Sequence, residues 1–159
     1  MIGLLQRVTE AQVEVNGSCI GAIGPGLLVL ACAQNGDGES EAERLIERIL
    51  NYRVFADAND KMNLSLRDVG GALLLVPQFT LAADTRKGTR PSFTPAAAPE
   101  EARRLFEHLL ACARATHAQV ASGEFGAHMR VSLVNDGPVT IWLQTSPPSN
   151  RGAPDMKRE

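Results

Sequence analysis

The sequence predicts a single α/β domain in which a mixed sheet carries two helices on one side. Two nearly continuous apolar segments, residues 26–33 and the start of 71–81, are typical of strands buried on both faces. Each is followed by a segment with helical periodicity, and 159 residues with 44% hydrophobic content suffice for one core. The order is therefore a strand pair, two strand–helix units and three strands, with the domain spanning 1–145 and a flexible, Pro-rich polar tail at 146–159.

The first element pair is a β-hairpin. Apolar Val13 and Val15 alternate with polar Gln12 and Glu14, the pattern of a half-buried strand. The dipeptide Asn16-Gly17 favours a two-residue turn because both positions of such a turn need positive φ. We therefore expect strands on both sides of this dipeptide.

Two helices follow the two buried strands. Ser40 and Glu43 fit a capping box at the start of the first helix. The second helix is predicted to begin at Pro99, since proline is favoured in the first turn. The side chains expected to face the core are Ala42, Leu45, Ile46, Ile49 and Leu50 in the first helix and Ala102, Leu105, Phe106, Leu109 and Leu110 in the second.

The connections carry turn and loop signals. Residues 57–61 form a turn cluster, and the segment from Ala82 to Pro99 predicts a long loop without regular structure. Three short strands are expected at the end, around Val120, at 129–134 and at 139–144, with a turn at the Asn-Asp-Gly of residues 135–137.

Composition excludes several classes of protein. A net charge of −2 and a pI near 5.9 argue against a surface coated with basic residues, and so against indiscriminate binding of DNA. No apolar stretch is long enough to span a membrane, and no signal peptide pattern is present. The odd number of widely spaced cysteines, Cys19, Cys32 and Cys112, favours buried reduced thiols over disulfides or a metal site, which fits a cytoplasmic location.

The usual catalytic motifs are missing. There is no nucleophile elbow, zinc-protease helix, Cys-x-x-Cys pair or phosphate-binding loop. His108 and His117 are nine residues apart and cannot form a ligand pair on one helix face, and His128 stands alone. All three histidines are therefore interpreted as surface or hydrogen-bonded polar residues, and no metal or cofactor is expected.

Two segments remain unusual. Residues 77–80, Pro-Gln-Phe-Thr, stand at the end of a buried strand, a frequent position for ligand sites in α/β sheets. Residues 135–140, Asn-Asp-Gly-Pro-Val-Thr, place Gly137 and Pro138 at the mouth of a strand. The residues alone leave two interpretations open for each segment, an ordinary solvated loop or turn, or a site formed by backbone groups.

Together, several motifs identify a family. The chain resembles the D-aminoacyl-tRNA deacylases, also called D-tyrosyl-tRNA deacylases, from Met1 to about Thr145. The resemblance rests on QRV at 6–8, AQVEVNG, GLLVL, DKMNLSLRDVGGALLLV, QFTL, KGTRPSF, GEFGAHM at 123–129 and NDGPVT. It implies the fold described above, a homodimer, and hydrolysis of the ester that joins a D-amino acid to the terminal ribose of tRNA.

The resemblance also implies how substrate is held. Gly137-Pro138 is expected to be a cis peptide whose carbonyls enter the active site of the partner subunit and bind the α-ammonium group. Arg7 and Met129 match positions that brace this motif and line the pocket, and Phe125 and Pro77 are placed with them as substrate-binding residues. Glycyl-tRNA should then also be a substrate, because glycine has no side chain to exclude.

For catalysis, the resemblance directs backbone N–H groups near Gln78 and Phe79 toward the ester carbonyl oxygen. Thr80 is the obvious side-chain nucleophile, but no base for it is recognisable. We therefore expect the 2′-OH of the RNA to assist water, with Thr80 as a positioning residue. A separate hypothesis assigns phosphate contacts near the tRNA acceptor end to Arg86, Lys87 and Arg90, against the alternative of a solvated charge run.

One position departs from the family pattern. Pro77 replaces the serine of the usual Ser-Gln-Phe-Thr, as in a paralogue that removes wrongly attached L-amino acids. Phe79, Met129 and residues 135–140 agree with the D-specific branch. Two alternatives therefore remain, an editing deacylase for L-aminoacyl-tRNA and a non-catalytic tRNA-binding protein.

Overall fold

The sheet is built around β1 (Ile2–Val15), which pairs with three other strands. In the computed structural model, which describes residues 1–146, the first half of β1 pairs with β3 (Gly26–Cys32) and its second half with β2 (Ser18–Ile23). On its other side β1 pairs with β8 (Arg130–Gln144) along almost its whole length. Parallel pairing continues the sheet from β3 to β6 (Ala72–Pro77) and β7 (Val120–Ser122), so the predicted mixed sheet is confirmed.

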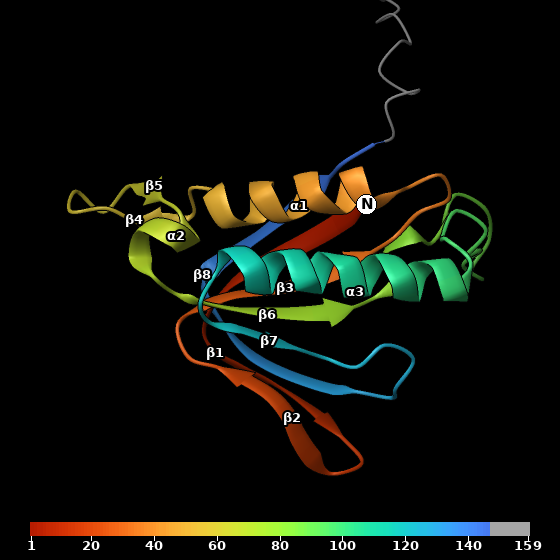
Figure 1. Ribbon diagram of the computed structural model, residues 1–159, viewed down its shortest axis with the longest axis horizontal. Helices are drawn as coiled ribbons and strands as arrows, with labels where there is room; N and C mark the ends of the chain where they lie inside the picture. Colours follow the sequence, from red (N-terminus) through yellow and green to blue (C-terminus); the bar gives the residue numbers. More distant parts are fainter. Residues whose placement is uncertain (147–159) are drawn as a thin grey trace, which may run out of the picture.

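Two helices cover one face of this sheet (Figure 1). These are α1 (Glu39–Asn51) and α3 (Pro99–Thr116), and they pack against each other and against β1 and β3. The predicted inward residues are buried in both helices, apart from Leu110, which is half-buried. The expected start of α1 is wrong, because Gly38 is the N-cap and the carboxylate that accepts its N–H, at 2.8 Å, belongs to Glu41.

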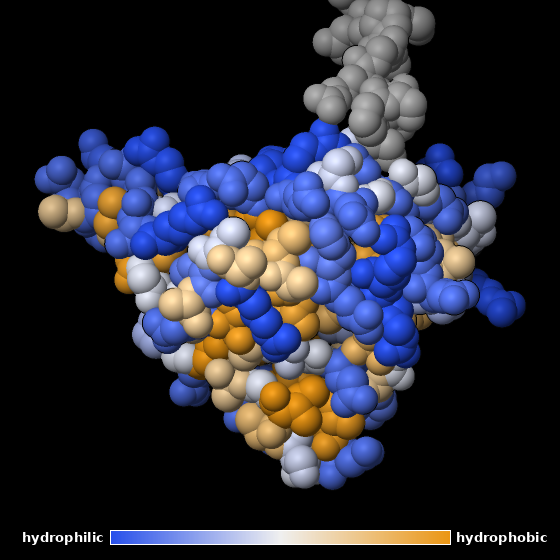
Figure 2. All heavy atoms as spheres, in the orientation of Figure 1, coloured by the Kyte–Doolittle hydropathy of each residue, from blue (hydrophilic) through white to orange (hydrophobic). Residues whose placement is uncertain are grey.

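The opposite face of the sheet has its own apolar core. It is formed where β2 and the outer parts of β1 and β8 curl over the central strands, and its fully buried members are Val8, Ala11, Val13, Leu28, Leu74 and Val76. A Cβ at Gly21 would lie 2.8 Å from the carbonyl oxygen of Ser122, so only glycine lets β2 pass this close to β7. In the view of Figure 2, apolar atoms gather over β2 and β7 and reach the second half of α3, whereas α1 and the first half of α3 present mostly hydrophilic atoms.

Three small elements were not expected from the sequence. A two-stranded ribbon, β4 (Phe55–Ala56) and β5 (Met62–Leu64), encloses the predicted turn cluster, and a single helical turn, α2 (Leu66–Val69), follows. The Asn16-Gly17 hairpin is confirmed, with φ of 51° and 78° at the two positions.

The end of the chain differs from the prediction. The strands expected at 129–134 and 139–144 are one continuous strand, β8, and no hairpin turn separates them. Instead, β1 residues Gln6 and Val8 pair with Thr140 and Asn135, so residues 136–139 form a bulge opposite the single residue between them. Most of the predicted tail, from residue 147, lies outside the described residues.

The cysteines are free thiols, as expected, but they are not equally buried. Cys32 is buried and Cys112 half-buried, whereas Cys19 is exposed because it lies on the short outer strand β2, so its predicted burial is wrong. Among residues 1–146, no helix is long and apolar enough to cross a membrane.

Candidate active site

The end of β6 leads directly into the first part of the site. The N–H of Gln78 donates to the carbonyl oxygen of Ala31 at 2.8 Å, which extends the β3–β6 pairing by one step. The chain then turns into a short 3-10 helix, η1 (Phe79–Ala82), which leaves the Phe79 ring 54% exposed. Phe93, from the long loop before α3, packs edge-on against this ring with centroids 5.0 Å apart.

A pocket of about 470 Å³ opens beside this turn. The end of β6, the first turn of α3 and the β7–β8 connection meet at the same end of the molecule, at the right of Figure 1. The residues that line the pocket are Pro77, Gln78, Phe79, Ala97, Pro99, Ala102, Phe125, Gly126, Ala127, His128, Met129 and Val131. Five residues predicted from the sequence are therefore brought together, although they come from segments far apart in the chain.

Thr80 is exposed beside the pocket, and its hydroxyl oxygen accepts a hydrogen bond from the Gln78 side-chain amide. Within residues 1–146, no histidine or carboxylate hydrogen-bonds to this hydroxyl. The expectation that the N–H of Gln78 faces the substrate needs one correction, because this N–H already donates to the carbonyl oxygen of Ala31. The first N–H groups of a helix have no acceptor inside it, so Phe79 and Thr80 supply the available donors.

Beneath η1 the site is closed by a buried thiol. Cys32 Sγ lies 3.5 Å from the carbonyl oxygen of Phe79 and 3.4 Å from that of Ala33, to which it donates. Burial raises the pKa of the Cys32 thiol to about 11. Cys32 is therefore a neutral packing residue under the pocket and not a nucleophile.

Two residues at the pocket were not predicted from the sequence. His128 lines the pocket, although its isolation in the sequence suggested an ordinary surface residue. The Arg103 guanidinium lies over the Phe125 ring, 4.9 Å from its centroid, and places a positive charge at the pocket wall. Neither has a sequence signal of its own, because each depends on the position of the β7–β8 connection relative to α3.

The predicted basic loop has one paired and two unpaired cations. Arg86 forms a two-pronged ion pair with Asp84, at 2.8 and 2.7 Å, and its hydrogen bonds lower the pKa of Asp84 to about 2. No ion pair within residues 1–146 includes Lys87 or Arg90, and both side chains are exposed. The free positive charge of this loop therefore comes mainly from these two residues.

The second unusual segment is the bulge in β8. Its Gly137–Pro138 peptide is cis, as the resemblance implied. Arg7 braces it from β1, since Nε donates to the carbonyl oxygen of Asp136 at 3.0 Å and Nη1 donates to that of Val54 at 2.6 Å. At the base of the bulge, the Asn135 side chain accepts from the N–H of Val139 at 2.8 Å.

This bulge is remote from the pocket of its own chain. Arg7 pairs with Leu27, which pairs with Leu73, so the bulge is level with the start of β6. The pocket lies after Pro77, about 13 Å further along the strands, and β8 is three strand spacings away, about 14 Å. Gly137, Pro138 and Arg7 are accordingly absent from the pocket lining.

The strand that carries the bulge is also an edge. Within residues 1–146, β8 pairs with β1 alone, which leaves the backbone groups of its other side without a strand partner. Two large apolar side chains on β8, Val134 and Trp142, are each 49% exposed. A long edge of this kind is a template for pairing with another chain.

Comparison with known proteins agrees with the resemblance seen in the sequence. Proteins named D-aminoacyl-tRNA deacylase from Ralstonia nicotianae and Thioalkalivibrio sulfidiphilus are 63% and 65% identical to this chain over 156 and 148 residues. These matches cover 95% and 93% of this chain, and 94% and 99% of the relatives.

Two solved structures share the fold. One, described as the c-Myc DNA Unwinding Element Binding Protein, has a TM-score of 0.88 and 39% identity, covering 92% of this chain and 100% of that one. The other, a probable eukaryotic D-amino acid tRNA deacylase, has a TM-score of 0.77 over 91% of this chain and 98% of that one, with 16% identity. A family model described as D-Tyr-tRNA(Tyr) deacylase matches residues 4–144, and the chain therefore belongs to the D-Tyr-tRNA(Tyr) deacylase family.

Proposed function

We propose that the chain hydrolyses the ester bond between a D-amino acid and the terminal ribose of tRNA, and that glycyl-tRNA is a further substrate. The observation that carries the proposal is the pocket at the end of β6, where Gln78, Phe79 and Thr80 meet Phe125 and Met129. Such an activity removes D-amino acids before they reach translation, so we also propose a proofreading role in the cytoplasm.

The site is completed by a second copy of the chain. In this proposal, Gly137 and Pro138 of one subunit enter the pocket of the other, and the assembly is a homodimer with two shared sites. Two features support it: the bulge lies on the order of 20 Å from the pocket of its own chain, and β8 leaves a long edge unpaired.

Chirality is selected by backbone and not by a side-chain pocket. Carbonyl oxygens of the Gly137–Pro138 segment bind the α-ammonium group that all amino acids share. A D-residue then directs its side chain away from the rigid segment, whereas an L-residue would press its side chain against it. The apolar, roomy lining around Phe79 and Phe125 is consistent with an enzyme that accepts many side chains.

The reaction needs little from titratable groups because the ester is already activated. A water oxygen attacks the ester carbon, and the N–H groups of Phe79 and Thr80 stabilise the oxyanion, contributing roughly 3–4 kcal/mol each. The bond to the ribose oxygen breaks, and the proton lost by water reaches that oxygen through the neighbouring 2′-OH. Thr80 positions these groups, since its own oxygen accepts from Gln78 and no histidine or carboxylate of residues 1–146 bonds to it.

The basic loop contributes to tRNA binding. Lys87 and Arg90, with Arg86 held by Asp84, offer positive charge on the segment whose Phe93 packs on Phe79. Phosphates next to the terminal adenosine would then lie beside the pocket. We further propose that residues 1–145 form the deacylase domain.

An alternative is editing of L-aminoacyl-tRNA, which Pro77 alone favours. The decisive experiment is single-turnover deacylation of D-Tyr-, L-Tyr- and Gly-tRNA by one preparation, with chelator present. We expect the D-Tyr and Gly esters to be cleaved and the L-Tyr ester to be spared. Cleavage of the L-ester with sparing of the D-ester would replace this proposal by the alternative, and no cleavage of any ester would favour a non-catalytic tRNA-binding protein.

The shared site is tested by mixing two inactive variants. Gly137→Ala damages the Gly137–Pro138 segment, here called the gate, and Phe79→Ala damages the pocket. A mixed dimer of the two retains one intact site if gate and pocket come from different subunits, so random mixing should restore about a quarter of all sites. No recovery after proven subunit exchange would place gate and pocket in the same subunit.

A further inference from the structure

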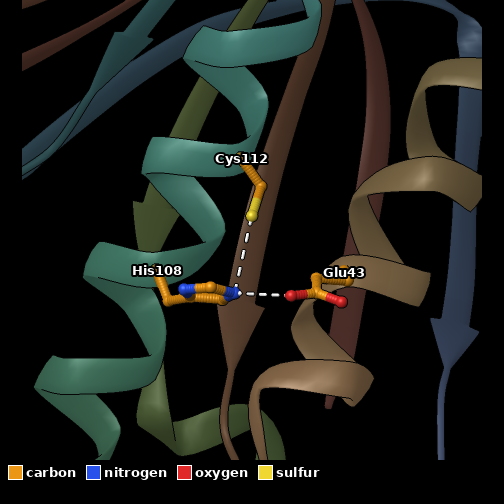
Figure 3. Close-up of side chains that lie close together, drawn as sticks. All are labelled: Glu43, His108 and Cys112. Carbon is orange, nitrogen blue, oxygen red and sulfur yellow. Dashed lines mark hydrogen bonds and ion pairs between the residues drawn. The ribbon is translucent and has the colours of Figure 1, made fainter.

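A group of side chains outside the pocket has no place in the proposed reaction. Glu43 comes from α1, and His108 and Cys112 lie one turn apart on α3, and the three point toward one another between the helices (Figure 3). His108 Nε2 is 3.0 Å from Glu43 Oε1 and 3.5 Å from Cys112 Sγ. All three donor atoms lie within 4.8 Å of one another.

We propose that Glu43, His108 and Cys112 bind a zinc-type divalent cation, with water completing a tetrahedral shell. Tetrahedral zinc with ligand bonds of about 2.0–2.3 Å requires about 3.4 Å between nitrogen and oxygen and about 3.6 Å between nitrogen and sulfur. The spacings of 3.0 and 3.5 Å in this cluster need only a small adjustment. The two ligand pairs that include His108 are therefore close to the spacing of a bound ion, while the Glu43 oxygen and the Cys112 sulfur, which lie within 4.8 Å, would close to about 3.6 Å.

The donor types select the class of metal. Thiolate and imidazole together favour zinc over magnesium or calcium, which prefer shells made of oxygen. Burial, with the nearby carboxylates Glu43 and Glu39, raises the pKa of the Cys112 thiol in the free protein. A divalent cation reverses that electrostatic setting, because it stabilises the thiolate and releases the proton.

The position of the site indicates its role. His108 and Cys112 lie about 9 and 15 Å along the α3 axis from Ala102 at the pocket. A cation there joins α1 to α3, which otherwise meet through apolar side chains and exposed ion pairs such as Arg104–Glu39. The bound metal therefore acts as a clamp between the two helices and leaves ester hydrolysis unchanged.

The test uses the full-length chain without a histidine tag, freed of metal by chelator and dialysis. Titration with Zn²⁺ in a calorimeter should give one ion per chain, and saturating Zn²⁺ should raise the melting temperature. Co²⁺ used as a probe should produce a thiolate-to-metal charge-transfer band. Cys112→Ser should abolish that band, and His108→Ala should weaken Zn²⁺ binding at least about tenfold.

Cys19→Ser is the matched control, because it removes an exposed thiol on β2 and should leave stoichiometry and band unchanged. Melting curves in chelator should be similar for all variants, so that weaker binding reflects the missing ligand and not a loss of folding. Absence of a stoichiometric site, or a site unaffected by Cys112→Ser and His108→Ala, would overturn the proposal. Deacylation with chelator, measured separately, reports on the proposed reaction and not on this site.

Discussion

The turn after β6 and the bulge in β8 both expose backbone groups, but the protein holds them in opposite ways. The turn at Gln78–Thr80 follows the end of β6, a strand paired on both sides, and it is anchored to Ala31, packed by Phe93 and closed beneath by Cys32. The bulge lies on an edge strand, and the side chain that holds it from outside β8 is Arg7. We call the turn at residues 78–80 the floor, because its own chain supports it, and the bulge at residues 136–139 the projection.

This difference indicates how each half of the proposed shared site is held in place. The floor is organised by its own chain, because β3, β6 and α3 surround it. Within residues 1–146, the projection is held at its base by Asn135 and Arg7, and in the proposed dimer a second subunit receives it. The predictions below perturb the floor and the projection separately, from the largest expected effect to the smallest.

The largest effect should come from the substrate and not from a side chain of the floor. A 2′-deoxy terminal adenosine should abolish turnover of D-Tyr-tRNA while binding persists, since the 2′-OH relays the proton in the proposed reaction. Thr80→Ala should reduce the single-turnover rate by less than about tenfold, as expected for loss of one positioning hydrogen bond. Near-normal cleavage of the deoxy substrate, with an inactive Thr80→Ala enzyme, would instead make Thr80 the nucleophile.

The second-largest effect should come from adding a side chain at Gly137 in the projection. At Gly137 the φ of +139° is unfavourable for other residues, and a new Cβ would lie 2.7 Å from Val139 Cγ2. Gly137→Ala should therefore shift the carbonyls and cost about a hundredfold in D-Tyr-tRNA cleavage, measured in single turnover. Gly17→Ala, at an exposed turn with open space, is the control for loss of a glycine with positive φ. Equal rates for the two variants would remove the gate from the mechanism.

The brace of the projection should be less sensitive but still specific. Arg7→Lys should cost roughly tenfold in rate, because lysine cannot hold the carbonyls of Asp136 and Val54 with a planar fork. Arg48→Lys is the matched control, since Arg48 also donates to a carbonyl of β8, that of Gln144 at 3.0 Å, away from the bulge. An Arg7→Lys enzyme with full activity and an unchanged melting temperature would show that the bulge needs no brace.

The basic loop should affect binding and leave chirality unchanged. Lys87→Gln with Arg90→Gln should weaken tRNA binding and reduce the salt slope by about 0.7–0.9 for each phosphate that the loop no longer neutralises. Replacing the neutral ion pair as a whole, by Asp84→Asn with Arg86→Gln, should change little, because the net charge of the loop stays the same. Lys61→Gln, on the distant β4–β5 ribbon, controls for net charge. An unchanged slope in the variant without Lys87 and Arg90 would identify the loop as a solvated charge run.

The smallest effect tests how tightly the floor is closed. With a pKa of about 11 against an ordinary 9.0, Cys32 carries about a hundredfold less thiolate at pH 8 than a free thiol. Alkylation at pH 8 should therefore modify Cys19 rapidly and Cys32 slowly, as measured by peptide mass spectrometry. Labelling of both at the same rate would mean that the floor opens to solvent.

Much of the fold could be predicted from residue patterns. Strands β3 and β6 and the inward faces of α1 and α3 followed from apolar periodicity, because burial on one or both faces imposes that period. One error arose where a local sequence signal competed with long-range strand pairing. The Asn-Asp-Gly signal at 135–137 predicted a turn, but pairing with β1 continues on both sides and turns it into a bulge.

The sequence by itself determined the floor, because Pro77, Gln78, Phe79 and Thr80 are consecutive at the end of one buried strand. Only the tertiary structure decided what lies around it and what does not. His128 and Arg103 reach the pocket wall through the packing of the β7–β8 connection on α3, while Gly137 is carried to the far side by strand register. The cluster of Glu43, His108 and Cys112 likewise appears only when α1 and α3 pack side by side, since Glu43 and His108 are 65 residues apart in the chain. The physical reason is common to all of them: periodicity fixes which face of an element is buried, but distances between elements are set by how the buried faces interlock.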